Sequence, residues 1–207
     1  PEGVKPWTSD WWATLEGEAP GSENFHANAG NVWRRRYGGD LQGLREKLPY
    51  LRELGVNAIY MTPIFEAASP HKYDATDHRH VDDNLGYKAE GWPSLGVAGE
   101  TAGPVSWTWT ASDRLFLDFL DEAHAQGFRV ILDGVFNHVG VDHFAFQDVL
   151  RNGKASRYAS WFEITDWGDP ERWGRAPWWE HHGKAGGIQW KAWDRDNGDL
   201  PTFAKDE

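Results

Sequence analysis

Cysteine is absent from this chain of 207 residues, which excludes disulfide bonds, thiolate metal sites and a cysteine nucleophile. No apolar run approaches the length of a membrane span, and no signal peptide is present. These absences leave the compartment open. Because the chain starts at Pro1 without an initiator methionine and stops at Glu207, we interpret it as a piece of a longer protein.

Positive charge is scarce: 21 Lys and Arg residues face 32 Asp and Glu residues, for a formal net charge of -11. This charge repels nucleic acids and anionic membrane surfaces, so neither is expected as a partner, and a neutral ligand is favoured. The nucleotide-binding signatures GxGxxG and the P-loop are also missing. Tryptophan is abundant, with 14 residues, and its flat rings suit both sugar faces and protein cores.

A short apolar run, Val130–Leu132, ends abruptly in the polar residues Asp133, Asn137 and His138. Such a run predicts a buried parallel strand that opens into a site. Polar side chains at the carboxyl end of a buried strand are costly unless they are hydrogen-bonded or bind something. The alternative is a loop whose polar side chains only satisfy backbone groups.

A helix is predicted before the first strand, with Asp40 as its cap and Gly55 at its end. Leucines recur between them at spacings of three and four residues, which is typical of a helix with one buried face. Pro49 lacks a backbone donor, so it predicts a kink or a break into two short helices. The apolar run Val56–Ile64 then predicts a strand.

The same order of helix, glycine and strand recurs further along the chain. Ser112 or Asp113 is expected to cap the second helix, Gly127 to end it, and the strand ending at Asp133 to follow. This βαβ arrangement predicts parallel strands and fits either a (β/α)8 barrel or an open doubly wound sheet. One more short helix is predicted over Phe144–Leu150.

Three longer motifs occur in order: YGGDLQGL at 37–44, GVNAIYMTPIFEAASPHKYDATDH at 55–78, and DGVFNHVG at 133–140. With a weaker match, GDLPTFAKDE at 198–207, they resemble the α-amylase family of glycoside hydrolases, and are most similar to its neopullulanase and cyclomaltodextrinase branch. The resemblance implies an α/β fold: a partial (β/α)8 TIM barrel with a loop-rich subdomain inserted after the strand ending at Asp133. Residues 1–36 would then be a loop-rich lead-in, 37–140 the βα units, and 141–207 the inserted subdomain, truncated before the catalytic strands.

The resemblance also implies roles for five residues. Tyr73 resembles the ring stacked under the sugar beside the scissile bond, and His138 the histidine that hydrogen-bonds its hydroxyls. Asp133 resembles the aspartate that braces the site, and His71, in the Tyr73 loop, is assigned to substrate binding. Asn137 resembles the amide that binds calcium in some members; no other cofactor is implied.

Alternative roles remain open for these side chains. Tyr73 fits a loop anchor as well, and His138 fits a core histidine whose ring nitrogens are satisfied by protein groups. Asp74 and Asp77 are interpreted as residues that brace the loop rather than touch the substrate.

The function implied by the resemblance is retaining hydrolysis of α-glucans such as maltodextrins. Retaining glycosidases use two carboxyl groups about 5 Å apart. The family carries them on later strands, so no catalytic residue is expected within this chain, and the nucleophile and the acid/base are expected beyond Glu207. A transglycosylase and a non-catalytic sugar-binding relative on the same fold are the alternatives.

A less favoured alternative is a metal-dependent hydrolase. His78, His80, Asp82 and Asp83 in DHRHVDD are similar in spacing to the HxHxDH motif of two-metal hydrolases, with Asp83 in place of the last histidine.

Overall fold

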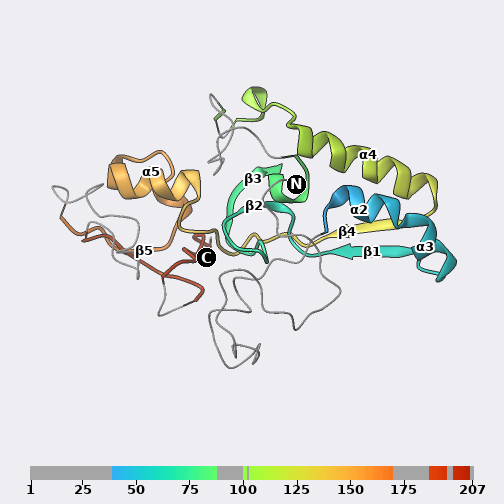
Figure 1. Ribbon diagram of the computed structural model, residues 1–207. Coiled ribbons are helices and arrows are strands. Elements are labelled where there is room, and N and C mark those ends of the chain that lie inside the picture. The colour runs from blue at the N-terminus through green and yellow to red at the C-terminus, as the bar shows by residue number, and fades with distance from the viewer. Residues whose placement is uncertain (1–38, 88–99, 102, 170–186, 195–197, 206–207) are drawn as a thin grey trace, which may run out of the picture.

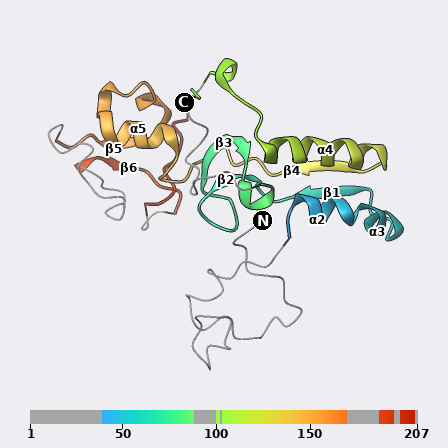
Figure 2. The ribbon, with the colours of Figure 1, turned by 45° about the horizontal axis from the view of Figure 1, so that its top comes forward.

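The computed structural model describes residues 39–87, 100–101, 103–169, 187–194 and 198–205. The expected lead-in, 1–36, therefore lies outside the described residues. Figures 1 and 2 show three helices, α2 (Leu41–Glu46), α3 (Leu48–Glu53) and α4 (Ala111–Ala125), beside two strands, β1 (Ala58–Met61) and β4 (Arg129–Leu132). Helix α5 (Phe144–Asn152) lies on the opposite side of the molecule.

Strands β1 (Ala58–Met61) and β4 (Arg129–Leu132) lie side by side and pair in parallel, with Ala58 opposite Arg129 and Met61 opposite Leu132. The predicted parallel pair is thus confirmed. The first strand is shorter than the predicted range 56–64. Because both strands run the same way, the side chains that follow them meet at one edge of the sheet.

The predicted break at Pro49 is confirmed. Two short helices, α2 (Leu41–Glu46) and α3 (Leu48–Glu53), replace one continuous helix, and the proline lies in the first turn of α3, where its missing N–H is not needed. Asp40 caps α2 by accepting a hydrogen bond from the backbone N–H of Gly43 over 2.8 Å.

Helix α4 (Ala111–Ala125) is capped by Thr110, so the prediction of Ser112 or Asp113 as the cap was wrong. The hydroxyl of Thr110 accepts from the Asp113 N–H, and the Asp113 carboxylate accepts from the Thr110 N–H. This reciprocal capping box places both predicted caps in the first turn.

The core of this part lies between the three helices and one face of the β1–β4 sheet. Ile59 and Val130 face the helices, whereas Tyr60 and Ile131 point away and are 62% and 50% exposed. Within the described residues, the helices therefore bury one face of the predicted strand and leave its other face exposed. The buried members of this core are Leu41, Leu48, Ile64, Val81, Leu115, Phe116, Phe119, Ala123 and Phe128.

The connection after β1 contains a hairpin that the sequence did not predict. Strands β2 (Phe65–Ala67) and β3 (Ala75–Val81) pair antiparallel, with irregular register, and enclose the loop that carries Tyr73. The polar run of β3 has weak hydrophobic alternation, so its pairing was not apparent from the pattern. Short 3-10 turns occupy Asp83–Leu85 and Pro104–Ser106.

The chain beyond residue 140 has a core of its own. Helix α5 (Phe144–Asn152), which confirms the predicted short helix, packs with a small antiparallel pair, β5 (Ile164–Asp166) and β6 (Gln189–Trp190). Two 3-10 turns, Gly153–Ala155 and Ala159–Trp161, follow α5. The buried residues of this core are Val139, Ala145, Phe146, Val149, Leu150, Tyr158, Phe162, Ile188 and Trp190.

The end of this second part returns to the end of β4. A bridge joins His138 to Thr202, and the N–H of Val139 donates to the Pro201 carbonyl over 3.1 Å. Pro201 and Thr202 are thereby brought next to His138 and Val139. Within the described ranges, no helix has the length and apolar character needed to cross a membrane.

Candidate functional site

A cavity of about 680 Å³ opens at the carboxyl end of β4. Most of its wall comes from the residues that follow the strand, and the rest from the Tyr73 loop and the returning segment. The lining residues are Tyr73, Asp133, Gly134, Val135, Phe136, Asn137, His138, Trp193 and Lys205. Four of the five residues assigned from the resemblance are therefore together, and His71 is not among them.

Asp133 links the strand end to two tyrosines. Its N–H donates to the Met61 carbonyl over 3.0 Å, which continues the parallel pairing for one more residue. Its Oδ2 accepts hydrogen bonds from the phenols of Tyr73 (2.7 Å) and Tyr60 (3.0 Å). These bonds to a carboxylate raise the pKa of both phenols above the ordinary value. The arrangement agrees with a bracing role for Asp133.

His138 is buried and positions the Tyr73 backbone. Its Nε2 donates to the Tyr73 carbonyl over 3.0 Å, and its Nδ1 accepts from the Asn137 amide nitrogen over 3.3 Å. Burial lowers the pKa of the imidazole, so the ring is neutral at pH 7. Both ring nitrogens have protein partners, so contact between His138 and a sugar stays a prediction.

The residue before Tyr73 has an unusual backbone conformation. Lys72 has φ 63°, in the left-handed region that non-glycine residues rarely adopt, and its side chain is buried. Its ammonium group donates to the Asp82 carboxylate over 2.5 Å and to the Ala67 carbonyl over 3.1 Å. Strain of this kind persists only where the surroundings hold it, and here it sets the direction in which the loop presents Tyr73.

Gly140 lets the β4 connection approach the Tyr73 loop. Its N–H donates to the Ala75 carbonyl over 2.9 Å. A Cβ atom at this position would lie 2.4 Å from the carbonyl oxygen of Asp74, closer than real Cβ contacts allow. The glycine that ends the DGVFNHVG motif is therefore required for space.

The other polar residues of the loop support its shape. Asp74 accepts from the N–H and the hydroxyl of Ser69, which confirms its predicted bracing role. His71 accepts from the Tyr73 N–H at Nδ1 over 3.1 Å, and it is not one of the residues that line the cavity. Contact between His71 and a substrate stays a prediction. Asp77 forms an ion pair with Arg79, two residues along β3.

The proposed set of metal ligands is not assembled, so that alternative was wrong. His78 donates from Nε2 to the Val135 carbonyl over 2.9 Å, His80 lies between two carboxylates, and Asp82 binds Lys72. The reason is that β3 contacts several elements at once, so its successive polar side chains reach different partners.

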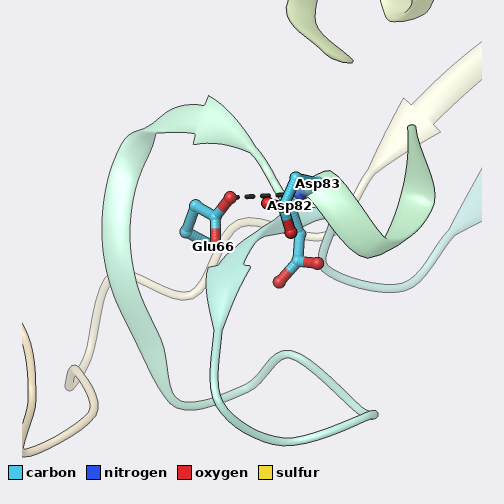
Figure 3. A group of neighbouring side chains, drawn as sticks. All are labelled: Glu66, Asp82 and Asp83. Atoms are coloured by element: carbon cyan, nitrogen blue, oxygen red, sulfur yellow. Dashed lines mark hydrogen bonds between the residues drawn. The ribbon is translucent and has the colours of Figure 1, made fainter. Parts of the chain in front are cut away.

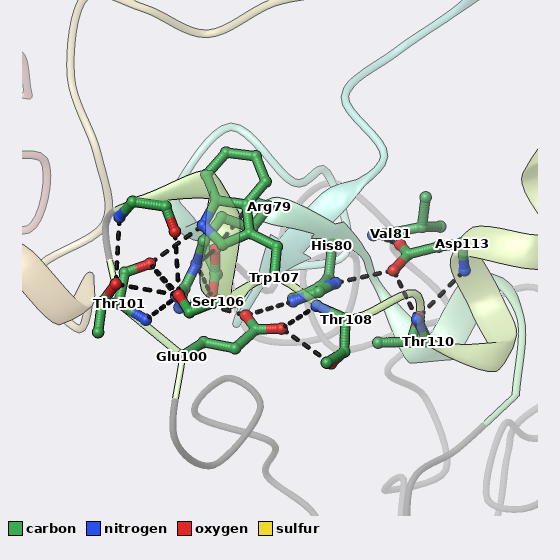
Figure 4. A network of polar contacts seen from close by, with 12 residues as sticks. Arg79, His80, Val81, Glu100, Thr101, Ser106, Trp107, Thr108, Thr110 and Asp113 are labelled. Atoms are coloured by element: carbon green, nitrogen blue, oxygen red, sulfur yellow. Dashed lines mark hydrogen bonds and ion pairs between the residues drawn. The ribbon is translucent and has the colours of Figure 1, made fainter.

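The partners of His80 form the network in Figure 4. Its Nδ1 lies 2.8 Å from the Asp113 carboxylate, and its Nε2 lies 2.7 Å from that of Glu100. The hydrogen bond to Asp113, together with Glu100, raises the pKa of His80 to about 9, and the pKa values of both carboxyls are lowered. His80 is therefore a protonated link between β3 and the cap of α4.

One group of three potential metal ligands is found in the described part of the chain: Glu66, Asp82 and Asp83, drawn in Figure 3. Burial raises the pKa of Glu66 to about 8, so this carboxyl keeps its proton at neutral pH, and Lys72 pairs with Asp82. These two features reduce the negative charge within the group. Calcium binding by Asn137 stays a prediction on which no reaction step depends.

Four residues of the site were not identified from the sequence: Tyr60, which donates to the Asp133 carboxylate, and Phe136, Trp193 and Lys205 in the cavity wall. The alternation within the predicted strand places Tyr60 on the face opposite Ile59, a signal that was available. Trp193 and Lys205 carry no local signal, because only the return of the chain after residue 190 brings them to the site.

Comparisons with known proteins agree on one group. The profile described as "Alpha amylase, catalytic domain" matches residues 18–92 and 111–200. Cyclomaltodextrinase of Thermoanaerobacter pseudethanolicus is 38% identical over 167 residues, which cover 81% of this chain and 21% of the relative. Neopullulanase 2 of Thermoactinomyces vulgaris is 41% identical over 149 residues, covering 72% of this chain and 21% of the relative.

Solved structures give the same result. The debranching enzyme of Nostoc punctiforme has a TM-score of 0.56 and 35% identity, over 80% of this chain and 27% of the other. The type III pullulan hydrolase of Thermococcus kodakarensis has a TM-score of 0.59 and 31% identity, and the match covers 84% of this chain and 23% of the other. The chain spans about a fifth of the length of the curated relatives it matches.

Proposed function

The chain belongs to the family of α-amylase catalytic domains, and from this membership we propose that it is part of a retaining glycoside hydrolase that acts on α-glucans such as maltodextrins. The observation that carries the proposal is the joining of Tyr73, Asp133 and His138 by hydrogen bonds in one cavity. The names of the relatives, cyclomaltodextrinase and neopullulanase, support the substrate class.

The architecture proposed for the chain is a part of a (β/α)8 barrel. The parallel pair β1–β4 would be two neighbouring central strands, and residues 141–207 a subdomain inserted after the second of them. The separate core around α5 supports an inserted unit. A cavity at the carboxyl ends of parallel strands is where barrel enzymes bind their substrates.

The proposed role of the cavity is to hold the sugar beside the scissile bond. The Tyr73 ring is 37% exposed, and an aromatic face of this kind packs against the C–H groups of a pyranose. The polar atoms of Asp133 and Asn137 lie around it, where they can orient hydroxyl groups, and His138 holds the Tyr73 backbone. Tyr60 and Tyr73 hold the Asp133 carboxylate at the strand end.

Bond cleavage needs two carboxyl groups about 5 Å apart, one as the nucleophile and one as the acid/base. Among the described residues, Asp133 is the one carboxylate that lines this cavity, and its Oδ2 already accepts from two phenols. We therefore assign substrate binding to the described residues. The reacting pair is proposed to come from later strands of the family domain.

The experiment uses the full-length gene product with maltoheptaose, β-cyclodextrin and pullulan. Proton NMR of the first product formed reports the anomer, and we expect the α-anomer, that is, retention. Products longer than the substrate would favour the transglycosylase, and binding without turnover would favour the non-catalytic relative. If wild-type protein neither binds nor cleaves any of the three glucans, the proposal is wrong.

A further inference from the structure

We infer that Trp193 is an aromatic platform between two neighbouring glucosyl subsites: the one at Tyr73 and a second one over Lys191 and Thr202. The inference rests on the proposed function, which it deepens by placing the next ring of the same α-glucan. Trp193 lines two cavities, the one already described and another of about 610 Å³. The two cavities also share Asn137 and Lys205.

The indole of Trp193 continues the wall that begins with His138. The two rings are nearly parallel, with an interplanar angle of 12° and centroids 6.0 Å apart. His138 is itself fixed by the Tyr73 carbonyl, so the indole is aligned with the first subsite. Trp193 is 62% exposed, which leaves a large apolar surface open to a ligand.

Two sets of hydrogen bonds hold the backbone that carries Trp193. The Trp193 N–H donates to the Leu200 carbonyl over 2.9 Å. The carboxylate of Asp194 accepts from the N–H groups of Asp199 (3.1 Å) and Leu200 (3.3 Å). A ring on a fixed backbone loses little conformational freedom when a ligand stacks on it, and this favours binding.

The second cavity has the chemistry that a neutral sugar requires. The exposed Trp193 supplies apolar surface, and Lys191 and Lys205 supply cationic donors for hydroxyl groups. The Lys191 ammonium lies 2.7 Å from the Glu163 carboxylate, so its position is set by an ion pair. Continuity with the first cavity makes the occupant the adjacent glucosyl unit, since both cavities share three lining residues.

The test measures how affinity depends on ligand length. Thio-linked α-1,4-glucans of two to five units, which resist hydrolysis, are titrated calorimetrically into the full-length gene product. In wild type, the unit that reaches the second subsite should tighten Kd by about tenfold, the size of a good aromatic stacking contact. In Trp193→Ala, the gain in affinity from that added unit should fall below about twofold. Ligands too short to reach the second subsite should lose less affinity.

Trp109→Ala is the matched control. Trp109 is 63% exposed, almost the same as Trp193, and it lines neither cavity. Removing its indole should leave the length dependence unchanged. Trp193→Phe keeps a flat ring and should retain most of the affinity step, which separates stacking from a folding defect.

The outcomes distinguish this inference from the proposed function. Tyr73→Ala should weaken binding of every ligand length, since the first subsite is needed by all of them. If Tyr73→Ala weakens binding but a folded Trp193→Ala variant keeps the wild-type step, the platform is refuted and the proposed function stands. If wild type binds none of the ligands, the proposed function fails and the inference fails with it.

Discussion

The imidazole of His138 donates a hydrogen bond of 3.0 Å to the main-chain carbonyl of Tyr73, 65 positions earlier in the chain. This bond joins the residues after β4 to the loop inside the β2–β3 hairpin. Since the phenol of the same tyrosine donates to Asp133, the loop is held at both its backbone and its side chain. The position of the Tyr73 ring therefore depends on residues that lie far from it in the sequence.

Replacing His138 by alanine should lower kcat/KM of the full-length gene product on maltodextrin by about tenfold or more, because Tyr73 loses its anchor. Tyr73→Ala should cause a similar loss through the missing ring. Tyr73→Phe is the control that keeps the ring and removes only the bond to Asp133. Thermal unfolding of each variant separates lost binding from lost folding, and wild-type turnover by a folded His138→Ala, Tyr73→Ala double variant would disprove the assignment.

Asp133→Asn should shift the titration of Tyr60 and Tyr73 to lower pH. Their phenol pKa values are raised because each donates to a carboxylate, and a neutral amide in its place stabilises the protonated phenol less. Ultraviolet difference titration between pH 9 and 12 measures the ionisation, and Tyr50→Phe, which removes an exposed tyrosine elsewhere, should leave the shift intact. Identical curves for wild type and Asp133→Asn would contradict the geometry.

Gly140→Ala should destabilise the fold by about 1–3 kcal/mol, the usual cost of forcing extra atoms into a packed site. The added Cβ would lie 2.4 Å from the Asp74 carbonyl oxygen, which belongs to the backbone and moves only with the Tyr73 loop. Sugar affinity should fall as well. Gly103→Ala is the matched control, because its Cβ would come only to 3.6 Å from the Thr101 hydroxyl. Equal unfolding midpoints in urea for the two variants would show that Gly140 does not lie tightly against the Asp74 carbonyl oxygen.

Stability should decline on the alkaline side because of His80. Its folded-state pKa of about 9 exceeds the ordinary 6.5, so its contribution is fully present below pH 6.5 and is lost as pH rises through about 9. The lowered pKa values of Glu100 and Asp113 act in the opposite direction: their contribution is present above their ordinary values and is lost as pH falls.

Unfolding in urea from pH 6 to 10 tests whether the protonation of His80 contributes to stability. Glu66, with a pKa raised to about 8 by burial, also lowers stability as pH rises, so the comparison of wild type with His80→Gln is what isolates His80. The variant should show a flatter alkaline decline. Parallel curves for the two proteins would mean that His80 is not charged in the fold.

The 207-residue chain alone should neither hydrolyse α-glucans nor fold well. In the part of the chain that the structure describes, one carboxylate lines the cavity, so those residues do not assemble the nucleophile and acid pair. Within the described residues, β1 and β4 each have one neighbouring strand, and Tyr60 and Ile131 leave one face of the pair uncovered. Aggregation or loose packing is expected by light scattering and thermal unfolding. A monomer with a sharp thermal unfolding transition would contradict the expectation of poor folding. Hydrolysis of α-glucans by this chain that His138→Ala abolishes would contradict the expectation that the chain is inactive.

The sequence by itself determined the local elements and the composition of the site. Proline and glycine restrict the backbone wherever they occur, so the helix break at Pro49 and the end of the first helix at Gly55 were predictable from single residues. Parallel strands deliver their following residues to one edge, so the approach of Tyr73 to Asp133 and His138 was predictable from the order of elements and the family motifs. The cap of α4 was missed because Thr110, Ser112 and Asp113 can all act as caps, and the backbone geometry chooses among them.

Only the tertiary structure decided which polar residues share partners and which distant segments complete the cavity. His78, His80 and Asp82 are close in sequence, yet each binds a different element, and a motif cannot show this because it records spacing and not direction. Trp193 reaches His138 through the pairing of residues near 200 with the strand end. Contacts between residues far apart in the chain depend on how its cores pack, and no local pattern contains that information.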